Sequence, residues 1–225
     1  MNERPARQGI RQRAIYTRWR ALPLDTAIVA AVLGLQALHV AVHQLLGAAG
    51  ADVDIVNIGG EQDVSTWFTS MLFAFAAAAA ALAAMAADGR AWAWGAVAAV
   101  MALFSLDEIA MLHEQVESSI DAAGIVRVML PLGALAALLI ALVVLRRFTP
   151  RQRVLLLLAA MSLFLAQLTA AINDAADLGS LATDPLGTLE ESLEVLVGAF
   201  ALAAAVPSAG AVVGARLSSR IESRE

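Results

Sequence analysis

Long apolar segments separated by short polar stretches repeat along the whole chain. Each is about 20 residues long or slightly more, the length an α-helix needs to cross the hydrocarbon core of a bilayer. The pattern therefore predicts an all-α, polytopic integral membrane protein with one six-helix bundle over residues 24–210, between tails at 1–23 and 211–225. The predicted spans are residues 25–47, 65–87, 91–113, 125–145, 153–177 and 188–207.

Breaker residues separate these spans. The turn at residues 88–90 is so short that the spans on either side of it are expected to be antiparallel neighbours. Pro207 and Gly210 are expected to end or bend the last span, because proline removes a helical hydrogen bond and crowds the preceding turn.

Composition supports the membrane assignment. The 225 residues are 60% hydrophobic and only 16% charged, with a mean hydropathy of +0.74, whereas a soluble domain is about a quarter charged. Alanine, leucine and valine supply the excess, which suits helices that pack closely in lipid through small side chains. The chain has neither cysteine nor lysine, which excludes disulfides, thiolate catalysis, cysteine-based metal sites, Schiff-base lysines and a P-loop lysine.

The arginines predict the topology. If both termini are cytoplasmic, every arginine except Arg127 falls on the cytoplasmic side, as the positive-inside rule requires. We therefore expect an N-in/C-in protein of a bacterial plasma membrane. Its expected partners are the bilayer and anionic lipids at the Arg-rich N-terminus, although a plain positive-inside anchor explains the same arginines. No nucleic-acid partner is expected.

The acidic residues gather on the opposite side. In this topology only Glu3, Asp25, Asp88, Glu222 and Glu225 lie at the cytoplasmic side. Because acidic residues contribute little to membrane insertion, insertion does not explain this asymmetry. We interpret it as a functional signal.

Ionisable residues also lie in the outer halves of several spans. Because placing an ionisable group inside a membrane costs free energy, such residues indicate a candidate functional site. The first span carries His39 and His43 on one helix face with Gln36. The start of the second span adds Glu61 and Ser65, which align with Thr69 at spacings of four if the helix begins early. The other members come from the third, fifth and sixth spans: Asp107, Glu108, His113 and Glu114; Asn173, Asp174 and Asp177; Glu190, Glu191 and Glu194. Asp107 and Glu194 are expected about 8–9 Å below the outer boundary.

A mixed set of imidazoles and carboxylates suits a divalent transition metal such as Zn, Mn or Fe. The predicted ligands are His39, His43, His113, Asp174, Glu190 and Glu194. The predicted catalytic residues are Asp107, Glu108 and Glu114. Such a site suits a hydrolase-like membrane enzyme acting on a lipid or lipid-linked substrate, with the metal activating water. The di-iron pattern Glu-x-x-His is absent, because Ala110 precedes His113 by three residues.

Two other functions fit the same residues. A cation- or proton-linked transporter or sensor would also use buried carboxylates, although transporter sites usually lie near the membrane midplane. A non-catalytic accessory protein would use these groups only to join helices, although such contacts average well under 1 kcal/mol in membranes.

Overall fold

The computed structural model describes residues 23–49, 64–86, 89–110, 144–176 and 185–222. These ranges contain five helices and no strand, and all five helices are long and apolar enough to cross a membrane. The all-helical, membrane-type prediction is thus confirmed for this part of the chain. The helices are α2 (Leu24–Ala48), α3 (Val64–Ala86), α4 (Ala91–Ala110), α7 (Pro150–Ala176) and α8 (Pro185–Glu222).

The fourth predicted span, 125–145, lies outside the described residues except for Val144 and Leu145. The number of six spans therefore stays a prediction. The predicted first three spans agree with α2, α3 and α4 within one residue at each end, apart from 111–113, which are not described.

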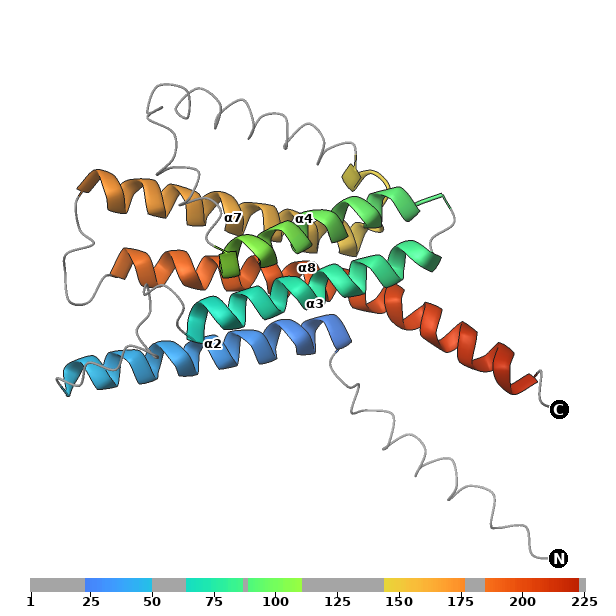
Figure 1. Cartoon of the computed structure of the whole chain (residues 1–225), viewed down its shortest axis with the longest axis horizontal. Coiled ribbons are helices and arrows are strands. Elements are labelled where there is room, and N and C mark those ends of the chain that lie inside the picture. Colours follow the sequence, from blue (N-terminus) through green and yellow to red (C-terminus); the bar gives the residue numbers. More distant parts are fainter. Residues whose placement is uncertain (1–22, 50–63, 87–88, 111–143, 177–184, 223–225) are drawn as a thin grey trace, which may run out of the picture.

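Helix α8 is the common partner of the bundle. Helices α2, α3 and α7 each pack against it, and α4 packs along α3 (Figure 1). Ser65 near the start of α3 contacts Glu191 near the start of α8, so these two helices run in the same direction. Gln36 of α2 contacts Ser192, Ser105 of α4 contacts Ser70, and Gln152 of α7 contacts Ser208. These contacts make α2, α4 and α7 antiparallel to α3 and α8.

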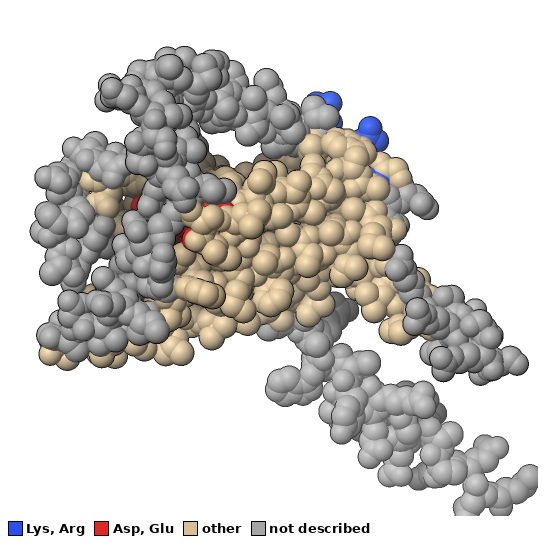
Figure 2. All heavy atoms as spheres, in the orientation of Figure 1, with Lys and Arg blue, Asp and Glu red and all other residues tan. Residues whose placement is uncertain are grey.

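This arrangement gives the bundle two chemically different ends. The end where α3 and α8 begin carries Asp107, Glu108, Glu190, Glu191 and Glu194, and we call it the acidic end. The end where α2, α4 and α7 begin carries Arg90, Arg146, Arg147, Arg151 and Arg153, and we call it the arginine end. Figure 2 shows the two charge types separated along the visible face, with uncharged side chains between them.

Small side chains fill the interior between the helices. One core cluster joins alanines of α3, α4 and α8, including Ala80, Ala93 and Ala205, around the ring of Trp94. Trp94 meets Phe148 edge to face, with ring centroids 4.6 Å apart. Large apolar side chains instead point outward and are more than half exposed: Leu35, Leu38, Phe75, Leu103, Ile109 and Phe164. Helices packed in lipid typically have small residues at their contacts and large apolar residues on their outer surface.

Three helix boundaries differ from the sequence-based prediction: the start of α7 and both ends of α8. Helix α7 begins at Pro150, three residues before the predicted start. Thr149 and Gln152 form a capping box there: the backbone N–H of Thr149 donates to Gln152 Oε1 over 3.1 Å, and the N–H of Gln152 donates to Thr149 Oγ1 over 3.4 Å. Pro150 then occupies the first helical position, where its missing N–H costs nothing.

Helix α8 extends beyond both ends of the last predicted span and does not end at Pro207. It starts at Pro185 and continues through Pro207 to Glu222. Figure 1 shows its C-terminal part turning away from the bundle. Next to the proline, the side-chain amide of Gln152 donates to the carbonyl of Ala204 (3.5 Å) and to Ser208 Oγ (2.9 Å). Neighbouring side chains that bond the backbone in this way allow proline inside membrane helices.

Candidate functional site

The start of α8 brings three carboxyl groups into the acidic end within two helical turns. Glu190, Glu191 and Glu194 are all half-buried. Glu191 is held by α3, because Ser65 Oγ donates to Glu191 Oε2 over 3.0 Å. Ser65 itself is fully buried. Glu191 is therefore fixed against α3.

Helix α4 adds two carboxyl groups at the same level. Asp107 and Glu108 are half-buried and lie in the last described turn of α4. Two residues before Asp107, Ser105 is joined to α3 by the hydroxyl of Ser70, which donates to the Ser105 carbonyl over 3.0 Å. This contact fixes the height of α4 against α3 and so of its two acidic residues.

Glu194 is the centre of this group. It lies nine residues into α8, about 14 Å from the first residue at 1.5 Å per residue. Four other carboxyl groups act on it electrostatically: Glu108, Glu191, Glu190 and Asp107, in decreasing order. We call these five residues the acidic cluster. It is built from two helices that are far apart in the sequence and scarcely touch each other directly.

A buried hydroxyl lies beside the acidic cluster. Thr69 follows Ser65 by one helical turn on the face of α3 that packs against α8. Its side chain is completely buried, and its Oγ1 has no hydrogen-bond partner within the described ranges. A buried polar atom without a partner is costly, so this oxygen is a candidate ligand for a bound group.

Helix α2 carries the two predicted histidine ligands next to α8. Gln36, buried on the same helix, donates from Nε2 to Ser192 Oγ over 3.2 Å. His39 and His43 follow one and two turns later; both are half-buried, and both already take part in interactions. Gln36, His39 and His43 were predicted to share one face of α2. Through Gln36, this face contacts α8 near the acidic cluster.

The complete set of predicted metal ligands is only partly covered by the structure. His113 and Glu114 lie outside the described residues, and the side chain of Asp174 on α7 is likewise not described. Among the side chains that are described, no three His, Asp or Glu residues are arranged to hold a metal ion. The transition-metal site with Zn, Mn or Fe thus stays a prediction.

The structure adds site residues that the metal hypothesis had not included. Glu191 belongs to the acidic cluster, Ser65 contacts it, and Thr69 lies one turn further along the same face of α3. Their signal in the sequence was a spacing of four residues, which aligns Ser65 and Thr69 on one face of α3. No pattern in the sequence predicted the contact between Asp25 and Arg151, which are distant in the chain and meet at the arginine end.

Apolar helices of membrane length, with lipid-type packing and ionisable groups inside the bundle, define a helical integral membrane protein. A model of the domain of unknown function DUF8692 matches residues 26–208, most of the chain, and the protein belongs to this family. No curated protein and no solved structure matches the chain.

Proposed function

We propose that this protein binds a cation inside the membrane and that the acidic cluster is its binding site. The observation that carries the proposal is Glu194, a half-buried carboxyl group within the bundle on which four further carboxyl groups act. Ionised carboxylates that share a low-dielectric site repel one another. A bound metal ion, or bound protons, removes this repulsion.

The distribution of positive charge supports the same proposal. Within the described ranges, the arginines that flank the helices of the bundle lie at the arginine end, across the membrane from Glu194. They therefore do not neutralise the acidic cluster. Buried charges in proteins are paired or bind metals, and a cation bound among these carboxyl groups would add positive charge that the described arginines do not supply.

The ligand atoms available favour a hard cation. The acidic cluster offers carboxylate oxygens, and Thr69 adds a buried hydroxyl oxygen without another partner in the described part of the chain. Oxygen-only sites suit Ca²⁺, Mg²⁺ or Mn²⁺. Protons are the other cations that carboxylates accept, and a proton-linked transporter or sensor would use them.

A metal-dependent membrane enzyme is the second candidate. It is favoured by the contact between Gln36 and Ser192, which holds the histidine-bearing helix α2 against α8 next to Glu191. In this proposal His39 and His43 complete the ligand set of a transition metal. The metal would polarise water or a carbonyl or phosphoryl group of a lipid-linked substrate. Asp107, Glu108 or Glu114 would accept the proton.

Cation binding to the purified protein tests the proposal. We expect Ca²⁺, Mg²⁺, Mn²⁺ or Zn²⁺, or a change of pH, to shift the thermal unfolding temperature of the wild type. The shift should be lost in Glu194→Gln, which removes the central charge. It should persist in Glu222→Gln, the same exchange in the last residue of α8 at the far end of that helix.

Elemental analysis and two further variants separate the candidates. Near-stoichiometric metal that is lost in His39→Ala or His43→Ala supports the enzyme, whereas metal retained in these variants supports an oxygen-only site. A pH effect that depends on Glu194 without any bound metal supports proton binding. Wild type and Glu194→Gln that respond identically to all four metals and to pH would refute the proposal.

A further inference from the structure

A groove runs between α2 and α7 at the arginine end of the bundle, away from the acidic cluster. Its two walls are α2 and α7, and its floor is Phe200 of α8. The volume is about 430 Å³, within the range of small-molecule sites. Because α2 and α7 both pack against α8 and are apart from each other along most of their length, the groove opens sideways, toward the surrounding lipid.

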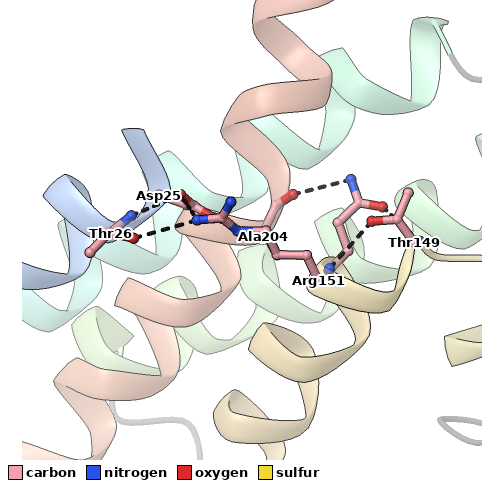
Figure 3. A network of polar contacts seen from close by, with 6 residues as sticks. Asp25, Thr26, Thr149, Arg151 and Ala204 are labelled. Atoms are coloured by element: carbon pink, nitrogen blue, oxygen red, sulfur yellow. Dashed lines mark hydrogen bonds and ion pairs between the residues drawn. The ribbon is translucent and has the colours of Figure 1, made fainter. Parts of the chain in front are cut away.

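One end of the groove is polar. The guanidinium of Arg151 on α7 forms an ion pair with Asp25 on α2: Nη2 donates to Asp25 Oδ1 over 2.6 Å, and Nε contacts Oδ2 (Figure 3). Nη2 also reaches Thr26 Oγ1 at 3.4 Å. The Asp25 side chain is almost fully buried, whereas that of Arg151 is 60% exposed. Asp25 therefore fixes the orientation of a guanidinium that still faces the surroundings.

This guanidinium has donors left for a ligand. Arginine carries five N–H donors in a planar fork, and the contacts with Asp25 and Thr26 involve only Nε and Nη2. Nη1 makes no hydrogen bond to any described residue. Beside it, the exposed hydroxyl of Thr26 accepts from Nη2 and keeps its own hydrogen for donation. A planar donor group next to a hydroxyl matches the oxygens of a phosphate.

The rest of the groove is apolar. Val29, Ala30 and Leu33 line it on α2, and Val154 and Leu155 line it on α7. On α2 the lining extends from residue 25 to residue 33, about 12 Å along the helix at 1.5 Å per residue. The groove thus changes from charged to apolar along the helix axis, in the same direction as a lipid changes from headgroup to acyl chain.

From this gradient we propose that the groove binds one anionic phospholipid, with its phosphate on Arg151 and Thr26 and an acyl chain along Val29, Ala30 and Leu33. The charge of the surroundings favours an anion, because this end carries Arg90, Arg146, Arg147, Arg151 and Arg153 but, within the described ranges, only two acidic residues, Asp25 and Glu222. The positive-inside rule also assigns this end to the cytoplasmic leaflet, which carries anionic lipids. The proposal does not depend on cation binding at the acidic end.

Native mass spectrometry of the full chain in detergent tests this proposal. Phosphatidylglycerol and phosphatidylcholine are added separately, and we expect one retained phosphatidylglycerol and little phosphatidylcholine. Ala30→Phe fills the groove and leaves the ion pair in place. It should abolish this preference, whereas Ala31→Phe, an equally large change at an exposed neighbour outside the groove, should not.

A second variant tests the headgroup contact. Asp25→Asn combined with Arg151→Gln removes the ion pair without leaving a single buried charge, and phosphatidylglycerol should then bind roughly fivefold more weakly. Equal retention of both lipids by the wild type, or a preference that survives both Ala30→Phe and the double variant, would overturn the proposal and indicate general annular lipid. Size-exclusion elution identical to that of the wild type confirms that each variant is folded.

Discussion

The side chain of Gln152 contacts both the start of α7 and the region of α8 next to Pro207. Its Oε1 accepts the backbone N–H of Thr149 at the start of α7, and its Nε2 donates to Ala204 and Ser208 of α8. The carbonyl of Ala204 lies in the turn that precedes Pro207, where a proline weakens the helical hydrogen bonds. The same buried amide thus caps one helix and supports the bent region of another.

We expect Gln152→Ala to lower the free energy of unfolding by about 1–3 kcal/mol, because buried polar groups at the start of α7 and beside Pro207 lose their partner. Gln167→Ala is the matched control, since Gln167 lies on the same helix but is exposed. Thermal unfolding in detergent measures both variants. A Gln152→Ala protein as stable as Gln167→Ala would contradict this role.

Helix periodicity predicted the faces of single helices, but not the partners of their side chains. It aligned Gln36 with the histidines and Ser65 with Thr69, and the structure brings Gln36 and Ser65 to α8. It could not predict that Glu191 is bonded by Ser65, because that contact depends on how α3 and α8 are placed side by side. Pairings between distant helices are set by tertiary packing, which a local pattern does not contain.

At the scale of helices, the contact between α3 and α8 depends on one glycine. A Cβ atom added at Gly198 would lie 2.9 Å from Leu72 Cβ and 3.3 Å from Phe73 Cδ1. Leu72 Cβ cannot rotate away, because it is attached directly to the backbone of α3. Close approach through a small residue of this kind is typical of helix pairs in membranes.

We therefore predict that Gly198→Ala destabilises the protein by about 1–3 kcal/mol, because the two helices must move apart to accommodate the methyl group. Gly34→Ala is the control: nothing lies within 4 Å of its added Cβ, and alanine favours a helix over glycine by about 1 kcal/mol. The two variants should shift the unfolding temperature in opposite directions. A Gly198→Ala protein at least as stable as the wild type would show that α3 and α8 are less closely packed than the structure indicates.

The apolar pattern predicted helix positions well because a membrane helix must be continuous and apolar over its whole length. The ends of α2 and α3 agree with the prediction to within one residue. Of the two outcomes predicted for Pro207, an end or a bend of the helix, the structure shows no end there, because α8 continues to Glu222. The amide of Gln152, which comes from another helix, supports α8 at this point.

At the scale of the whole molecule, the two ends of the bundle carry opposite charge. By the positive-inside rule, this predicts that the arginine end faces the cytoplasm and the acidic end faces outward. Single cysteines can be introduced directly, because the natural chain has none. Ala49→Cys follows α2 at the acidic end, and Arg147→Cys lies at the arginine end; both positions are exposed. On intact cells a membrane-impermeant maleimide should label Ala49→Cys, and should label Arg147→Cys only after permeabilisation. The reverse pattern would place both ends on the opposite sides of the membrane.

The position of α8 in the sequence has a consequence for how the protein is made. Helices α2, α3 and α7 all pack against α8, which is the last of the described helices to be synthesised. While the ribosome is still translating, the earlier helices can enter the bilayer and α3 can pack against α4, but α2 and α7 lack the helix against which they pack. Insertion of the earlier helices therefore precedes assembly of the complete bundle. The carboxyl groups of α4 enter the membrane before those of α8, so the acidic cluster forms only after α8 has been inserted.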